Sequence, residues 1–427
     1  MEPSFIQRGL VWRSLAVVGI ALSSCSTVVP TAAPETRVAS TPAPTATATP
    51  GPSPSPTPLA TAGNAPTSWT EVFDKGPAVL NDISAGANGL LAAGCLANAA
   101  GDCEQALLLG SRDGMTWTEA RLAGAAHASI KRLRRIGDRI VAVGFVVDDE
   151  RKEVRSIAWA SADGVRWSSV PTASSMNTTL EDVIASPTGA IAIGGAARYA
   201  SEGGGFVVWN VSADGTFGRP RDIEIAGRPQ GVNGGIWAFD RFLAWGPCGP
   251  CPSGDSVRST VLMSSVDGGA WKVLPPSTAF HGGSVTEVVD AGHRLVAVGF
   301  EGDSWPTSPR GWLSTDGVHW DVAQVPTDSA SIESVAFDGK RFVALGEDTS
   351  DPSGGSSSPV AWVSNDGMAW TRLPPDDGLP ALTGFRVIGR VEVAGRVCSA
   401  GTFYGDPRQS GPLAAIYCHD VAGGSSG

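Results

Sequence analysis

Short apolar runs that end in glycine recur along most of the chain at intervals of about 50 residues. They occupy residues 90–94, 140–144, 190–194, 242–246, 295–299, 342–346 and 397–401. Other segments, such as residues 332–337, alternate between polar and apolar positions. Runs of this length predict β-strands in packed sheets, and a repeat of about 50 residues is typical of the blades of a β-propeller.

A second repeat, Ser-x-Asp-Gly-x-x-Trp, lies between the apolar runs. Its complete copies contain the pairs Asp113 and Trp117, Asp163 and Trp167, Asp267 and Trp271, Asp316 and Trp320, and Asp366 and Trp370. A further copy keeps Asp214 but has Gly218 in place of the Trp. The Asp side chain can accept backbone N–H groups across a turn in which Gly supplies a positive φ. We therefore expect these segments, the Asp turns, to be structural, with the Trp packed between sheets.

The chain has seven apolar runs but only six Asp turns. Residues 68–72 look like a strand that follows an Asp turn, and residues 413–418 look like a strand that precedes one. We therefore predict an all-β fold, a seven-bladed β-propeller with four-stranded antiparallel blades over residues 68–420. The N-terminal strand would complete the last blade and remove an exposed sheet edge. Residues 421–427 would form a flexible tail.

The repeats resemble the Asp-box, or BNR, repeat of sialidase-like and sortilin-like propellers over about residues 68–420, although the motif is one residue shorter than its fullest form. The resemblance implies the fold and leaves the function open. Sialidase chemistry would need an Arg cluster, a Tyr nucleophile with a Glu partner, and an acid–base Asp. Tyr occurs only at positions 199, 404 and 417, none of them on an expected inner strand.

Two hypotheses for function therefore remain. The first is a non-catalytic module that binds an extracellular carbohydrate or protein ligand, or that assists envelope assembly as some similar propellers do. The second is a sialidase-like or other glycoside hydrolase, for which Asp182 and Glu287 are a conceivable carboxylate pair. We assign no catalytic residue from the sequence.

The N-terminal segment has the pattern of an export signal, with Arg8 and Arg13 before an apolar stretch over residues 14–22. The residues that end at Cys25 resemble a bacterial lipobox, which implies cleavage after residue 24 and attachment of lipid, including palmitate, to the Cys25 thiol. The alternative is an ordinary signal peptide that happens to contain a Cys. Residues 26–67 are rich in Pro, Thr, Ala and Ser, so we expect residues 25–67 to form a disordered tether. These features predict a protein outside the cytoplasm, anchored to the membrane by its N-terminal lipid.

Six Cys residues follow Cys25, an even number that predicts disulfides in an exported chain. We expect Cys95 to pair with Cys103 and Cys398 to pair with Cys418. Cys248 and Cys251 form a Cys-Gly-Pro-Cys sequence that matches the thioredoxin active site, but the residues that follow lack a helical pattern. A small structural disulfide is therefore preferred over redox catalysis.

Binding residues are expected on the face opposite the Asp turns, where the longer loops lie. The exposed aromatic candidates are Tyr199, Trp305, Phe403 and Tyr404. The alternative is that they are loop tips packed on neighbouring loops. The inner strands should place Asp82, Arg132, Asp182, Glu287 and Ser334 at equivalent positions along the central channel, with Arg386 and Arg390 in the last blade. Such a ring suits a polar ligand or a cation, and the alternative is a solvated channel wall.

The net charge of −11 argues against a nucleic-acid partner, because contact with phosphates requires a basic surface. The 5 His residues are dispersed without metal-ligand spacing. We therefore expect no metal and no cofactor, and we expect a monomer.

Overall fold

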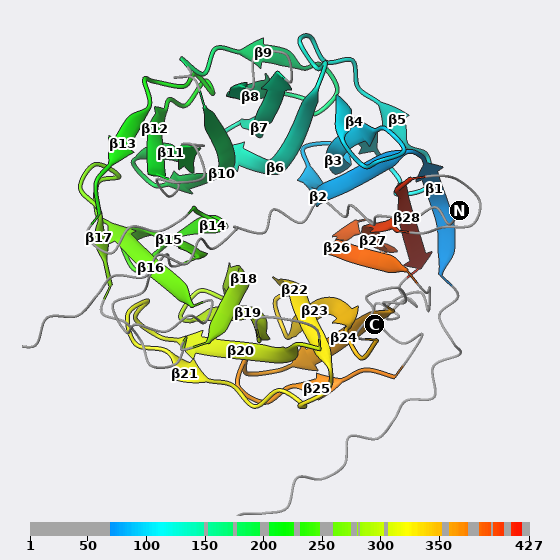
Figure 1. Cartoon of the computed structure of the whole chain (residues 1–427), viewed down its shortest axis with the longest axis vertical. Coiled ribbons are helices and arrows are strands. Elements are labelled where there is room, and N and C mark those ends of the chain that lie inside the picture. The colour runs from blue at the N-terminus through cyan, green and yellow to red at the C-terminus, as the bar shows by residue number, and fades with distance from the viewer. Residues whose placement is uncertain are drawn as a thin grey trace, which may run out of the picture. The chain divides into compact units, whose positions relative to one another are not determined.

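The computed structural model describes residues 69–148, 153–173, 177–196, 205–225, 231–247, 259–274, 280, 282–302, 306–351, 358–374, 384–393, 396–404 and 411–420. Within these ranges the strands form seven four-stranded antiparallel sheets. The sheets are arranged as blades around a ring (Figure 1). The predicted seven-bladed β-propeller is confirmed. None of the described segments is a helix that could cross a membrane.

Each blade is a meander from the channel outward. The inner strands are β2 (Ala78–Gly86), β6 (Ala128–Ile136), β10 (Thr178–Ser186), β14 (Gly234–Ala238), β18 (Gly283–Asp290), β22 (Ala330–Phe337) and β26 (Phe385–Val393). The second strands are β3 (Gly89–Ala97), β7 (Arg139–Asp148), β11 (Gly189–Ala196), β15 (Arg241–Pro247), β19 (Leu295–Glu301), β23 (Phe342–Asp348) and β27 (Arg396–Phe403). The third strands are β4 (Cys103–Ser111), β8 (Glu153–Ser161), β12 (Gly205–Val211), β16 (Thr260–Ser265), β20 (Ser308–Ser314), β24 (Pro359–Ser364) and β28 (Leu413–Asp420). The outer strands are β5 (Thr118–Glu119), β9 (Ser168–Val170), β13 (Arg221–Ile223), β17 (Lys272–Val273), β21 (Asp321–Val322), β25 (Thr371–Arg372) and β1 (Thr70–Lys75).

The hydrophobic core is divided among the spaces between blades. Buried side chains form seven clusters, each drawn from two neighbouring blades. The largest buried side chains come from the third strands and are Trp159, Trp209, Trp312 and Trp362. Each blade therefore depends on both of its neighbours to cover its two apolar faces.

The first and last strands of the domain close the ring. Strand β1 pairs with β28 in antiparallel fashion, and Thr70 lies opposite Cys418. Cys418 is joined by a disulfide to Cys398 on the adjacent strand β27. The Tyr417 hydroxyl donates a hydrogen bond to the carboxylate of Glu71. In Figure 1 the blue β1 lies beside the dark red β28, so the predicted closure by the N-terminal strand is confirmed.

The repeated glycine at the end of each apolar run marks a close approach between backbones. A β-carbon on Gly94 would lie 1.9 Å from the carbonyl oxygen of Val79 on the inner strand. The same contact would be 1.9 Å for Gly346 with Ser331 and 2.4 Å for Gly401 with Arg386. Six of the seven pairs of inner and second strands also change register beside this glycine, as in a β-bulge. The bulged backbone leaves no room for a side chain on the neighbouring strand.

The Asp turns connect third strands to outer strands through a shared set of hydrogen bonds. In the first blade the Asp113 carboxylate accepts the backbone N–H groups of Met115 and Thr116, each at 2.8 Å. Ser111 donates to the same carboxylate at 3.1 Å. The backbone N–H groups of Thr116 and Met115 lower the pKa of Asp113 to about 2. Gly114 has a φ of 74°, a conformation that favours glycine.

The Trp side chains that follow the Asp turns pack against the sheets. Trp370 is buried, and its indole N–H donates to the carbonyl of Gly367 at 3.1 Å. Trp117, Trp167 and Trp271 make the same bond with the glycines of their own turns. Trp320 is also buried, but its indole N–H has no partner among the described residues.

Removing β1 should destabilise the propeller more than removing most of the preceding segment. Deletion of residues 69–75 exposes the edge of β28 and takes Trp69, Val72 and Phe73 away from two core clusters. Loss of one large buried side chain costs about 2–5 kcal/mol. Deletion of residues 26–60, where the sequence predicts no fold, should leave the melting temperature unchanged. Thermal melts of the two deletion variants test this, and equal melting temperatures would contradict closure by β1.

Replacing the glycine at a close approach should be far more damaging than replacing a glycine in the same blade that has space. A β-carbon on Gly110 would meet nothing closer than 3.7 Å, a normal contact. We expect Gly94→Ala to cost at least about 2 kcal/mol, since the strands must separate, and Gly110→Ala to cost less than about 1 kcal/mol. Chemical denaturation measures both, and similar midpoints for the two variants would show that the close approach carries no strain.

Candidate functional site

The two faces of the ring differ in what they present. The turn after the first inner strand lies beside an Asp turn, because the Asn88 side-chain amide donates to the carbonyl of Asp163 at 2.9 Å. The inner strand β2 therefore ends at the face that carries the Asp turns. Its first residues lie at the opposite face, as does Tyr404, which follows the end of β27.

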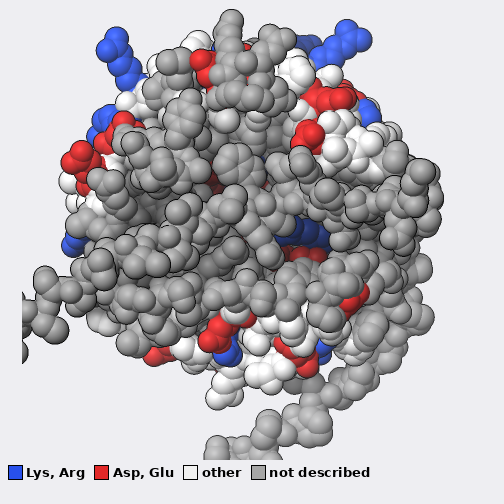
Figure 2. Space-filling model, in the orientation of Figure 1, with Lys and Arg blue, Asp and Glu red and all other residues white. Residues whose placement is uncertain are grey.

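A cavity of about 440 Å³ lies in the channel toward this opposite face. Every blade contributes to its wall. The lining residues are Val79, Leu80, Asn81, Lys131, Arg132, Glu181, Val232, Asn233, Thr286, Glu287, Glu333, Arg386, Val387, Ile388, Thr402 and Tyr404. Basic and acidic side chains are visible together inside the ring in Figure 2.

The bulges of the inner strands determine which residues face the cavity. In each bulged inner strand, the extra residue comes just before the position that the sequence assigned to the channel, such as Asp82. Together with the matching residue of the fourth blade, these extra residues form a second ring. The members of this bulge ring are Asn81, Lys131, Glu181, Asn233, Thr286, Glu333 and Ile388. Sequence reasoning missed this ring, although polar residues at six of its seven positions were a signal that could have revealed it.

Several members of the bulge ring tie their blade to the next one. The Asn81 side-chain amide donates to the Ile130 carbonyl at 2.8 Å. The Thr286 hydroxyl donates to the Ile332 carbonyl, also at 2.8 Å. Asn233 makes the corresponding bond to the carbonyl of Val285 at 3.2 Å. These side-chain donors are therefore occupied by the neighbouring blade.

The predicted residues Asp82 and Asp182 do not line the cavity. Arg134 lies between them, with its Nε 2.9 Å from the Asp182 carboxylate and its Nη1 3.6 Å from the Asp82 carboxylate. Asp182 is 1% exposed and also accepts the backbone N–H of Gly235 at 3.3 Å. Asp82 accepts the backbone N–H of Leu133 at 2.7 Å. These two carboxylates therefore hold neighbouring blades together beside the channel.

A second ion-pair cluster lies at the junction of the sixth and seventh blades. The guanidinium of Arg386 contacts the Glu333 carboxylate at 3.2 Å and the Glu347 carboxylate at 3.7 Å. The charge of Glu333 is the main cause that raises the pKa of Arg386 above its usual range. Tyr404 lines the cavity near this cluster and is 50% exposed. The predicted exposure of Phe403 is wrong, because Phe403 is buried at the end of a strand that faces the core.

Arg132 and Glu287, both predicted as binding residues, do line the cavity. The Arg132 guanidinium donates to the carbonyl of Asn81 at 3.2 Å. Burial raises the pKa of the Glu287 carboxyl, although the positive charges of Arg132 and Arg134 oppose this shift. Ser334 is buried, and it occupies the position in its inner strand that Asp82 occupies in β2, as predicted.

Other predicted residues lie outside the described part of the chain. They are Cys25, Tyr199, Cys248, Cys251 and Trp305. The disulfides Cys95–Cys103 and Cys398–Cys418 are present as predicted. Among the described residues, no group of three or more His, Cys, Asp or Glu side chains is arranged to hold a metal ion.

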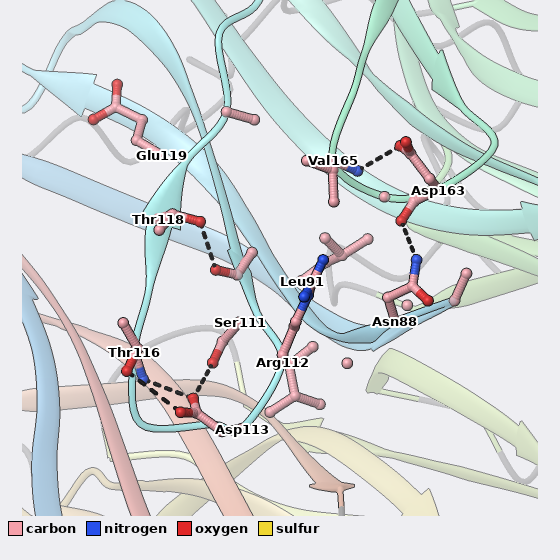
Figure 3. Close-up of a pocket in the computed structure, with 17 residues that line it drawn as sticks. Asn88, Leu91, Ser111, Arg112, Asp113, Thr116, Thr118, Glu119, Asp163 and Val165 are labelled. Carbon is pink, nitrogen blue, oxygen red and sulfur yellow. Dashed lines mark hydrogen bonds between the residues drawn. The ribbon is translucent and has the colours of Figure 1, made fainter.

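Another cavity, of about 420 Å³, lies between the first two blades on the face of the Asp turns. Asp113 and Asp163 lie on its two sides, and Arg112 projects into it (Figure 3). The dashed lines in this view show that both Asp side chains are engaged within their own turns. Its wall therefore consists largely of the turn structure itself.

Comparisons with known proteins extend the description of the fold. No protein-family model matches the sequence, and no curated protein matches it. Among solved structures, the β-propeller domain of the trilobed protease from Pyrococcus furiosus is similar, with a TM-score of 0.48 and 13% identity over 81% of this chain and 96% of that chain. A Trypanosoma rangeli sialidase has a TM-score of 0.43 and 14% identity over 73% of this chain and 57% of that chain. An α-L-arabinofuranosidase from Fusarium graminearum has a TM-score of 0.44 and 13% identity over 84% of this chain and 99% of that chain. At these identities the similarity concerns the fold alone.

Proposed function

We propose that this protein is a cell-surface lipoprotein whose propeller binds an extracellular carbohydrate or protein ligand, or assists envelope assembly, through the face opposite the Asp turns. The observation that carries the proposal is the polar cavity at that face, to which every blade contributes. Its volume of about 440 Å³ lies within the range of small-ligand sites. In the proposed protein, lipid on Cys25 anchors the chain and residues 26–67 carry the propeller away from the membrane.

A binding role is supported by the way the carboxylates are used. Asp182 is buried in an ion pair with Arg134, so it is not placed to act with Glu287 as an acid–base pair. Asp82 is held by Arg134 and by a backbone N–H group. These contacts hold neighbouring blades together beside a charged channel, which suits recognition of a polar ligand.

A glycoside hydrolase is the second candidate, and the cavity contains one arrangement that favours it. Tyr404 lies near Arg386, which in turn pairs with Glu347. Glu287 lines the same cavity with a raised pKa, as a proton donor in glycoside hydrolysis requires. Under this alternative Tyr404 or a nearby carboxylate would act on the sugar and Glu287 would supply the proton.

Binding and hydrolysis can be separated with one set of glycans and peptides. We expect the soluble chain from residue 26 onward to retain ligands on a glycan and peptide array and to release no reducing sugar from them. Tyr404→Ala should weaken retention, because it removes an aromatic side chain from the cavity. Arg112→Gln, on the other face, is the control and should bind as the unchanged protein does. Release of reducing sugar that is lost in Glu287→Gln would support the hydrolase instead.

Membrane attachment is tested through the predicted lipid site. Replacing Cys25 by Ser removes the thiol that would carry the lipid, and the acyl chains supply about 0.8 kcal/mol per buried CH₂ group. We expect the unchanged protein to partition into the detergent phase of extracted cells and Cys25→Ser to appear in the aqueous phase. A Ser24→Ala variant should remain anchored, since small residues before the Cys are accepted. Detergent partitioning of Cys25→Ser equal to that of the unchanged protein would contradict the lipid anchor.

A further inference from the structure

Four charged side chains of the cavity remain without a counter-charge at ion-pair distance in the described part of the chain. Lys131 and Arg132 are adjacent on the second blade, Glu181 is on the third and Glu287 is on the fifth. Lys131 has its ammonium 5.4 Å from the centre of the Phe145 ring. Arg132 donates only to a backbone carbonyl. All four side chains are partly buried.

Two other cations near the channel are already paired with carboxylates. Arg134 lies between Asp82 and Asp182, and Arg386 contacts two Glu side chains. A ligand would have to break these pairs to use them. The four remaining charges have no ion pair to break, although Arg132 and Glu287 attract each other across the cavity.

Partial burial of these charges is unfavourable, because burial removes water that would otherwise solvate them. For Arg132 the charges of nearby carboxylates, Glu287 first among them, offset this cost. The raised pKa of Glu287 reflects this penalty. A ligand that brings both an anion and a cation supplies a counter-charge to the basic and to the acidic side chains. The hydroxyl groups of a neutral sugar provide hydrogen bonds but no counter-charge, so they relieve this penalty less.

The cavity also has an apolar portion of its wall. The partly exposed apolar side chains of this wall are Val79, from the first blade, and Ile388, from the seventh. Tyr404 adds a half-exposed aromatic ring. A ligand with an apolar side chain next to its charged groups would cover this surface as well.

We propose that the cavity binds a zwitterion of the amino-acid class, a free amino acid or a dipeptide with apolar side chains. Its carboxylate contacts Lys131 and Arg132, and its ammonium group contacts Glu181 and Glu287. This inference rests on the proposed function in that it uses the same cavity, and it names the ligand class.

Calorimetric titration with leucyl-leucine and its blocked forms tests the proposal without any change to the protein. We expect leucyl-leucine to bind and the N-acetylated form, the C-terminal amide and the doubly blocked form each to bind at least about ten-fold more weakly, since each loses a charged contact. Equal affinity for the free and doubly blocked forms would overturn the proposal, because it would show that only the apolar wall is used.

Variants of the four charged residues locate the site. Arg132→Gln should weaken the binding of leucyl-leucine more than the binding of its C-terminal amide. Glu287→Gln should weaken the binding of leucyl-leucine more than the binding of its N-acetylated form. Arg112→Gln, which removes a cation on the other face, should bind leucyl-leucine as the unchanged protein does. Thermal melts confirm that each variant is folded. If arrayed glycans bind in a Tyr404-dependent way while leucyl-leucine does not bind, the zwitterion proposal fails and the proposed function stands. If neither class binds the soluble chain, both fail.

Discussion

The antiparallel pairing of β1 with β28 is the interaction on which the rest of the propeller depends. Each blade has two apolar faces, and each face is covered only by the neighbouring blade. The seventh blade packs against the first and the sixth blades and so buries one apolar face of each. Because its outer strand comes from the other end of the domain, the ring joins sequence-distant segments in one sheet. The contacts between inner strands around the channel therefore depend on the sheet that closes the ring.

A closed ring explains why the channel is both ordered and charged. The inner strands approach each other at the centre, where backbone carbonyls and N–H groups of one blade meet side chains of the next. Asn81, Thr286 and Asp182 each use these groups to fix a neighbour. Side chains that serve the architecture in this way are not available to a ligand. The residues left over, rather than the whole charged ring, define what the channel can recognise.

Much of the fold could be predicted because its main constraints repeat in the sequence. The period, the Asp turns and the glycine at each close approach follow from local geometry, and each appears in almost every blade. The candidate site was only partly predictable. A bulge cannot be inferred from the alternation of side chains, so the ring at Asn81 was missed although the ring at Asp82 was found. Phe403 was expected to be exposed because it follows the apolar run 397–401 on the face of the longer loops. The strand instead continues through it, and its side chain is buried in the core.

The position of the disulfide next to the closing strand determines how the domain would respond to a pulling force. In the proposed lipoprotein, tension between the membrane and a bound ligand reaches the propeller at Thr70, the first residue of β1. Thr70 lies opposite Cys418, and Cys418 is covalently held to Cys398 one strand further in. The load therefore acts first on the β1–β28 ladder, while the disulfide holds β28 to the blade. Tension would therefore act on β1 before any other strand, at the point where the ring is closed.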